Sequence, residues 1–437
     1  MTLSLSDDQW TKLGGKLFLL QPSSTTKLSK TTTTLTGGGL SAKLDFLKTD
    51  PQTKDFGIGV VDLTAGPSSP VIWMNNESVA WRAGSTAKIA ILLAAVQLRD
   101  DVRAAQSFVP DAADLDELFA SAKLWSLGTD PKLRQIAGKA HAPRISTIFD
   151  FSKPQAEFAG PDADSPDETD IAGRLNAATS GGGHLNWPLT TDFDFSERLW
   201  LAGARSDNVA ATSCISEIGV AYLKAVQRAY GLFDPSNGLK LLLAGPYTGS
   251  VGTSVPVSNA SSTIKYRALQ DIERNPVRDA IKSASGAFDD QSSWESTSAL
   301  ALTTYLIALM QEDLVAFGHG LSFGSVGCKT IRANLSPGSA NTTRSFIAEG
   351  VATVAQVTKQ MTKIGLLGIE DGEPGPLNCE FAYLETKETS APAKVMKYGV
   401  LVTGIRSKNN PDGSPGPEAA AVTRTLGQTI HQALVAP

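Results

Sequence analysis

The sequence contains few of the residues that build metal sites or disulfide frameworks. Its 437 residues include 3 cysteines and 4 histidines. None of them is paired at the spacing that ligands of one metal ion use, and three scattered cysteines do not make a disulfide framework. We therefore expect no metal ion and no cofactor.

An excess of positive charge is also missing. Lys and Arg together number 39 against 44 for Asp and Glu, which gives a net charge of −5. A protein built around nucleic-acid backbones needs a basic surface, so we expect no nucleic-acid partner. The partner that we expect instead is a small-molecule substrate, and nothing in the sequence indicates the oligomeric state.

Long hydrophobic runs are absent as well. Ile89–Leu98 and Ala299–Met310 are the longest strongly apolar stretches, and both are too short to span a bilayer. The N-terminus lacks a basic segment followed by an apolar run, so it does not resemble a secretory signal. We expect a soluble protein that is cytoplasmic as written, or periplasmic or secreted if an export signal was removed.

Strand patterns lie near both ends of the chain and helical patterns fill the middle. We expect four strands, of which the first two form a hairpin: Phe56–Leu63, Val71–Asn75, Asn378–Glu388 and Lys397–Ile405. We expect helices over Leu40–Lys48, residues 85–102, Asp207–Tyr230, Thr297–Leu314 and Pro417–Ala436. This order predicts an α/β (α+β) fold, with an antiparallel sheet flanked by helices from both termini and an inserted all-helical subdomain.

The same patterns suggest three parts of the chain. Residues 1–39 are expected to be a peripheral N-terminal extension. Residues 40–99 and 345–437 are expected to form the α/β subdomain, and residues 100–344 the helical subdomain with an insertion. Within that insertion, Gly160–Asp170 is acidic and Ser180–Gly183 is glycine-rich, so both are expected to be exposed loops.

An S-x-x-K motif stands at the start of the first long apolar helix, with Ser85 and Lys88 one turn apart. Burial lowers the pKa of a lysine and lets its neutral amine accept a proton. A serine beside such an amine is a nucleophile that is activated without histidine. The motif also arises by chance, and Ser24–Lys27 is a second match in a polar segment without a helix behind it.

Two later motifs carry polar groups that suit the same chemistry. In Ser206-Asp207-Asn208, Ser206 could relay a proton and Asn208 could donate its amide to a substrate carbonyl, although these residue types are also the best helix caps. In Lys363-Ile364-Gly365, the lysine could present a cation at a cleft and the glycine permits close approach of a substrate. The alternative for Lys363 is an ordinary surface lysine.

The three motifs in this order resemble the penicillin-recognising serine enzymes, the serine β-lactamases and penicillin-binding proteins. The resemblance covers about residues 40–437 and implies a β-lactamase/transpeptidase-like fold. It implies that Ser85 is the nucleophile, Lys88 its base and Ser206 a proton relay. It also implies an electrostatic role for Lys363, and substrate contacts from Asn208, Ile364, Gly365 and Leu366, with the backbone N–H groups of Ser85 and Leu366 as the oxyanion hole.

The sequence departs from that family at three points. Ile364 stands where the family has Thr or Ser, whose hydroxyl helps to bind a substrate carboxylate. The gap between Lys88 and Ser206 is longer than in typical β-lactamases. No acidic residue occurs between Asp234 and Asp271, where a water-activating Glu is expected, which leaves later acids such as Glu273 or Glu295 as replacements.

These observations predict a serine hydrolase that forms an acyl-enzyme on Ser85 and hydrolyses an amide, β-lactam or ester. A carboxylesterase on the same scaffold and a penicillin-binding module with little turnover remain alternatives. A different nucleophile is Ser322 in the G-x-S-x-G match Gly320–Gly324. That motif requires a strand before it and a helix after it, with His431 as partner, and we expect neither element there.

Overall fold

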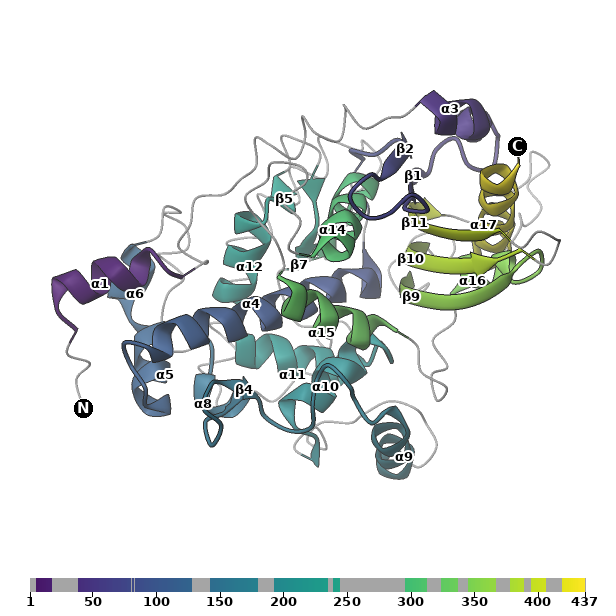
Figure 1. The fold of residues 1–437 in the computed structure, drawn as a ribbon. Coiled ribbons are helices and arrows are strands. Elements are labelled where there is room, and N and C mark those ends of the chain that lie inside the picture. Colours follow the sequence, from purple (N-terminus) through teal and green to yellow (C-terminus); the bar gives the residue numbers. More distant parts are fainter. Residues whose placement is uncertain are drawn as a thin grey trace, which may run out of the picture.

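The computed structural model describes residues 5–17, 38–79, 81, 83–127, 142–179, 192–234, 239–243, 295–312, 324–336, 345–366, 378–388, 394–405 and 419–436. Figure 1 shows a sheet at one end of the molecule, helices gathered at the other, and the long helix α4 (Ile89–Gln106) running through the helical part. The chain is therefore mixed α/β, as the sequence predicts. No helix in these ranges is long and apolar enough to cross a membrane.

Five antiparallel strands form the main sheet, in the order β2-β1-β11-β10-β9. They are β1 (Gly57–Asp62), β2 (Val71–Asn75), β9 (Gln356–Leu366), β10 (Asn378–Lys387) and β11 (Val395–Ile405). The predicted hairpin of the first two strands is confirmed, and so is the joining of strands from both ends of the chain. Strand β9, which carries the Lys363 motif, lies at the edge of the sheet.

The sheet buries both of its faces. On one face, Val61, Phe381 and Leu401 belong to the larger core, which also contains the helical region. On the other face, Val60 and Val400 belong to a second core. Because side chains alternate along a strand, neighbouring residues of one strand belong to different cores.

The second core is closed by helices from both ends of the chain. These are α3 (Gly38–Leu44), the short 3₁₀ helix η2 (Asp45–Lys48), α16 (Phe346–Val351) and α17 (Ala419–Val435), which lie beside the sheet in Figure 1. The sheet is thus flanked by helices from both termini, as expected.

The larger core is built mainly by helices. Their bounds are α1 (Asp7–Gly14), the 3₁₀ helix η3 (Gly84–Lys88), α5 (Ala112–Ala120), α6 (Ala122–Ser126), α8 (Ile145–Ile148), α9 (Glu168–Ala178), α10 (Phe195–Gly203), α11 (Asn208–Ile218), α12 (Val220–Ala229), α14 (Ala299–Gln311) and α15 (Ser325–Leu335). Short ladders join β3 (Phe149–Asp150) to β4 (Glu157–Phe158), β5 (Phe233–Asp234) to β6 (Leu239–Lys240), and β7 (Leu242–Leu243) to β8 (Glu295–Ser296). The domain boundaries themselves stay predictions.

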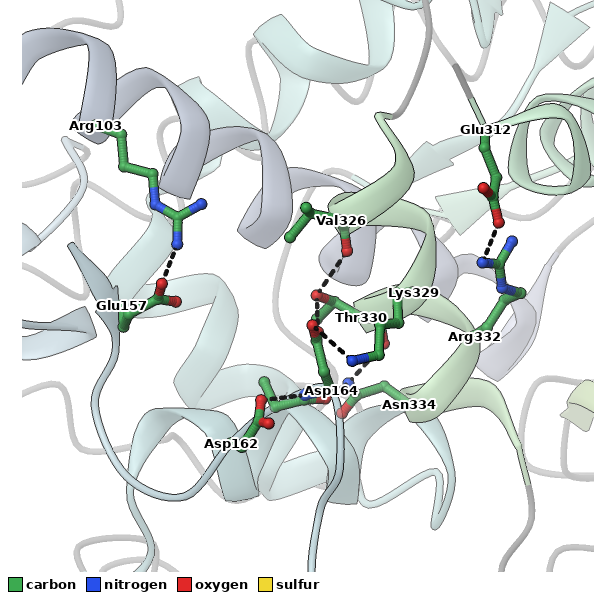
Figure 2. A network of polar contacts seen from close by, with 11 residues as sticks. Arg103, Glu157, Asp162, Asp164, Glu312, Val326, Lys329, Thr330, Arg332 and Asn334 are labelled. Carbon is green, nitrogen blue, oxygen red and sulfur yellow. Dashed lines mark hydrogen bonds and ion pairs between the residues drawn. The ribbon is translucent and has the colours of Figure 1, made fainter. Parts of the chain in front are cut away.

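The acidic segment Gly160–Asp170 is only partly the exposed loop that we expected. Figure 2 shows Asp164 turned toward α15, where its carboxylate accepts a hydrogen bond from Thr330 and forms an ion pair with Lys329 at 3.7 Å. Asn334 of the same helix donates to the carbonyl of Ala163 at 3.0 Å. The segment is therefore fastened to α15 at its centre. The second expected loop, Ser180–Gly183, lies outside the described residues.

The expectation of a peripheral N-terminal segment is wrong for residues 5–17. Helix α1 places Trp10 and Leu13 in the larger core, and Leu17 follows them, with exposed fractions of 5%, 0% and 0%. Lys123 of α6 lies over the Trp10 ring and pairs with Asp7 at 2.9 Å. The sequence did not predict this contact. Three apolar residues give only a weak helical period, and a polar stretch follows them.

Candidate active site

Ser85 lies on a tight turn rather than at the N-cap of the long helix. The turn is η3, and α4 begins only at Ile89. Gly84, just before the serine, has φ of +51°, a conformation that glycine adopts at little cost. Ser85 is half-buried, whereas Thr86, Ala87 and Lys88 are buried. The turn thus leaves the serine as its accessible residue.

Thr86 fastens this turn to the sheet. Its hydroxyl lies 3.1 Å from the carbonyl oxygen of Cys379 on β10 and 3.4 Å from that of Lys363 on β9. Sequence reasoning missed Thr86, since it occupies a variable position of the S-x-x-K motif. Only its residue type, a hydroxyl within a buried turn, could have indicated a fastening role.

Gly365 allows the turn and the edge strand to approach closely. A Cβ atom at this glycine would lie 1.9 Å from the carbonyl oxygen of Ala83 and 2.8 Å from the Thr86 hydroxyl. The sequence assigns Gly365 to substrate binding, and in the structure it adjoins the backbone of the serine turn. That placement also brings the backbone of Leu366 toward this turn, although its part in an oxyanion hole stays a prediction.

Lys88 is fully buried and its amine faces the Ser206–Asn208 turn. Nζ donates to the Ser206 carbonyl oxygen at 2.7 Å, to Asn208 Oδ1 at 2.6 Å and to Ser206 Oγ at 3.4 Å. The structure thus brings together the first two motifs, which lie far apart in the sequence. Because Oδ1 of Asn208 accepts from Lys88, its amide nitrogen is left to donate elsewhere.

The Ser206–Asn208 turn also caps a helix, so the two interpretations of this motif apply to different residues. Asp207 is the N-cap of α11, and its side chain accepts from the N–H of Ala210 at 2.8 Å. Ser206 has φ of +59°, which a residue with a side chain rarely adopts. Such strain persists only where the surroundings enforce it, and here it accompanies the contact of Ser206 with Lys88.

Opposing effects set the protonation of Lys88. Burial lowers its pKa from 10.5 to about 7, while attraction by Asp207 and, to a smaller extent, Glu295 raises it. A neutral amine is therefore well populated near neutral pH. Such an amine can accept a proton from a hydroxyl, which an ordinary surface lysine cannot do at that pH.

Lys363 is buried, and the surface-lysine interpretation is wrong. Its Nζ has no hydrogen-bond partner among the described residues. Burial, and then the neighbouring charge of Lys88, lower the pKa of Lys363 well below the usual range. The third motif therefore places a second amine close enough to Lys88 for their charges to interact.

Ile364 faces away from Lys363. It pairs across the sheet with Glu380, whereas Lys363 pairs with Phe381, so the two neighbours project from opposite faces. Ile364 is 6% exposed and Glu380 is fully buried. The contact of Ile364 with substrate stays a prediction.

Glu295 is the later acid that the structure brings to the site. It lies on β8, is 3% exposed, and is close enough to Lys88 for its charge to raise the pKa of that lysine. Glu273, the other acid that the sequence suggested, lies outside the described residues. So does Ser24–Lys27, the second S-x-x-K match.

The rival motif at Gly320–Gly324 lies outside the described residues except for Gly324. We expected no helix after it, and this is wrong, because α15 begins at Ser325. Burial of Cys328, Ile331 and Leu335 overrides the weak helix propensity of that stretch. His431, its proposed partner, is buried in the second core region, where its ring nitrogens contact Tyr398 Oη at 2.9 Å and Glu388 at 2.8 Å.

No metal cluster is evident in the part of the chain that the structure describes, where no three His, Cys, Asp or Glu side chains gather suitably. The site offers the hydroxyls of serine and threonine, the amide of Asn208, two buried amines and two carboxylates. Such a set can activate a serine and bind a polar substrate.

Comparisons with known proteins give similarity in structure only. No family model and no curated protein matches the sequence. Solved structures with similarity include the class A β-lactamase from Mycobacterium abscessus, at 13% identity and a TM-score of 0.43, covering 90% of this chain and 99% of that one. The ancestral (GNCA) class A β-lactamase is 16% identical with a TM-score of 0.42, over 90% and 99% of the two chains. A β-lactamase from Burkholderia phymatum is 13% identical with a TM-score of 0.41, over 91% and 98%.

Proposed function

We propose that this protein is a serine hydrolase that works through an acyl-enzyme on Ser85. The observation that carries the proposal is the state of Lys88, a fully buried amine with a pKa of about 7 one turn from a half-buried serine. Its hydrogen bonds to Ser206 and Asn208 add the polar partners that a proton-transfer site needs.

In the proposed reaction, neutral Lys88 takes the hydroxyl proton as Ser85 Oγ attacks the carbonyl carbon of the substrate. The backbone N–H groups of Ser85 and Leu366 stabilise the oxyanion of the tetrahedral intermediate. The leaving group departs with a proton that passes from Lys88 through Ser206, and the acyl group remains on Ser85. Water then attacks this ester. The oxygen and one hydrogen of the water leave with the released acid, and its other proton passes to Ser85 Oγ, which restores the hydroxyl.

Asn208 and Lys363 are the proposed substrate contacts. The Asn208 amide nitrogen donates to a polar group of the substrate, and the buried Lys363 supplies an electrostatic anchor. The proposed bond classes are amide, β-lactam and ester, which share an electrophilic carbonyl carbon.

A carboxylesterase is the second candidate, and it rests on the residue type at position 364. Isoleucine has no hydroxyl, whereas the family that the three motifs resemble has Thr or Ser there. Loss of one hydrogen bond to a charged group costs roughly 1.5–3 kcal/mol, which weakens binding of a carboxylate by about ten- to a hundredfold. Neutral esters avoid this loss, so they are expected to react better than penicillins.

Three probes test both candidates. The protein is incubated with a chromogenic cephalosporin, p-nitrophenyl acetate and a fluorescent penicillin, and intact mass reports any stable adduct. We expect labelling that Ser85→Ala abolishes and Ser322→Ala, the control from the rival motif, leaves intact. Labelling that survives Ser85→Ala contradicts the proposed nucleophile.

A further inference from the structure

Glu295 is a buried carboxylate that belongs to none of the three motifs. It is 3% exposed, and such burial of a carboxylate is costly unless a cation or hydrogen bonds compensate. It lies on β8, which pairs with β7 in a short ladder that places Glu295 opposite Leu243. Its position is therefore set by backbone pairing and not by a flexible loop.

The neighbours of Glu295 hold that ladder firmly. Gln227 of α12 is 1% exposed and binds both backbone groups of Leu243, accepting from its N–H at 2.9 Å and donating to its carbonyl oxygen at 3.2 Å. Two residues after Glu295, Thr297 exchanges backbone hydrogen bonds with Trp81, each at 2.9 Å. Trp81 lies just before the η3 turn, so the ladder is tied to the segment that carries Ser85.

Four titratable groups come from segments that pack together around the η3 turn. They are Lys88 itself on η3, Asp207 before α11, Glu295 on β8 and Lys363 on β9. Strands β8 and β9 both contact η3, and Lys88 donates to the turn that precedes α11. The Asp207 carboxylate already caps α11.

We propose that Glu295 is a positioning residue of the Ser85 site: its buried carboxylate, held by the β7–β8 ladder beside the η3 turn, is a counter-charge to the ammonium of Lys88 in the resting site. This inference rests on the proposed function, in which only neutral Lys88 takes the serine proton. It gives the chain an acid from outside the motifs, brought to the site by the β7–β8 ladder. Its role is electrostatic, acting through Lys88 and not on the substrate.

The test replaces Glu295 with glutamine, which removes the negative charge and keeps the shape of the side chain. Glu295→Gln removes a carboxylate whose attraction raises the pKa of Lys88, so that pKa falls. The rate of Ser85 acylation below the pKa of Lys88, the acid limb of its pH profile, then rises severalfold relative to its plateau at high pH. It rises by less than it does in Asp207→Asn, because Asp207 has the larger effect on Lys88. Glu295→Asp keeps the charge and is expected to keep the limb in place.

Two further variants make the comparison sharp. Glu380→Gln is the matched control, since this glutamate is equally buried but lies on the opposite face of the sheet from Lys363, and it is expected to leave the limb unchanged. Asp207→Asn removes the other charge while keeping a good N-cap, so it shifts the limb in the same direction as Glu295→Gln. If Glu295→Gln does not fold, Glu295→Leu repeats the test with an apolar side chain.

A direct titration separates this inference from the proposed function. The protein is labelled with ¹³C,¹⁵N-lysine, and the side-chain resonance of Lys88 is assigned by its loss in Lys88→Met. The pH at the midpoint of its titration is then measured in the original protein and in Glu295→Gln. A lower midpoint in Glu295→Gln supports the inference even if Ser85 proves not to be acylated. An unchanged midpoint overturns it, and so does slowed deacylation with an unchanged acid limb, which would make Glu295 the base for water.

Discussion

Lys88 is held between two protonation states by its own contacts. Three acceptor atoms surround its Nζ, two from Ser206 and one from Asn208. An ammonium can donate to all three, whereas a neutral amine has only two N–H groups. Hydrogen bonding thus favours the charged form. Burial favours the neutral form and is the largest cause of the pKa of about 7, against the attraction of Asp207 and Glu295.

The first prediction concerns the pH dependence of acylation. Because neutral Lys88 is the proposed base, the rate of Ser85 labelling is expected to rise with pH and to level off above about pH 7, where its pKa lies. Stopped-flow measurement of the acylation burst between pH 5 and 9 gives the profile. A rate that is flat across this range would contradict the role of Lys88.

The second prediction concerns the chemistry of that residue. Lys88→Arg keeps a positive charge but cannot lose its proton, so it is expected to be nearly as damaging as Lys88→Ala. Each change is expected to slow acylation by about a hundredfold or more, the usual effect of removing a general base. Near-normal acylation by Lys88→Arg, in a protein that melts like the original, would show that Lys88 is structural only.

At the scale of elements, the site depends on how closely the η3 turn and β9 approach each other. Gly365 removes the side chain that would separate them, and Thr86 bridges them with its hydroxyl. From the sequence we expect a helix over residues 85–102, whereas the structure has a separate turn, η3, before α4 begins at Ile89. The sequence also does not predict the Thr86 bridge or the left-handed Ser206, because these arise from contacts between segments that are distant in the sequence.

The third prediction tests this approach. Gly365→Ala places a methyl group 1.9 Å from the Ala83 carbonyl oxygen, so backbone atoms must move. We expect a loss of acylation of at least about tenfold and a destabilisation of roughly 1–3 kcal/mol, the range for overpacking. Gly39→Ala is the control, because its Cβ would meet no atom within 4 Å. Equal activity of both variants would show that the turn and the strand need no close contact.

At the scale of the whole molecule, the site is assembled from four separate stretches of the chain. They are residues 84–88, 206–208, 295 and 363–365, which meet where the sheet adjoins the helical region. Sequence patterns predicted the mixed α/β class and the sheet shared by both termini, since strand periodicity is local. They did not predict the core contacts of α1, because so short a segment shows no strong helical periodicity. They also did not predict the contact of Asp164 with α15, because the sequence of an acidic loop does not indicate which helix it will contact.

Glu380 links the stability of the whole fold to pH. Burial raises its pKa to about 8, although hydrogen bonds from Ser345 and from the N–H groups of Ile347 and Phe346 oppose this rise. The folded protein therefore keeps a proton on Glu380 between about pH 4.5 and 8, where the unfolded chain has lost it. When the folded state binds more protons, its stability falls as pH rises through that window.

The fourth prediction follows from this sign. The glutamine in Glu380→Gln cannot ionise, so this variant does not lose stability in that pH window. The free energy of unfolding of the variant minus that of the original protein is therefore expected to increase as pH rises from 5 to 8. The gain is on the order of a few kcal/mol, because a tenfold difference in proton affinity between the folded and unfolded states corresponds to about 1.4 kcal/mol. The depressed pKa of Lys88 gives the opposite slope above about pH 7, but it is present in both proteins and cancels in the difference. Urea unfolding of the two proteins at pH 5, 6, 7 and 8 measures that difference. A difference that stays constant with pH would mean that Glu380 is ionised in the folded protein throughout, held by its hydrogen bonds with Ser345 and α16.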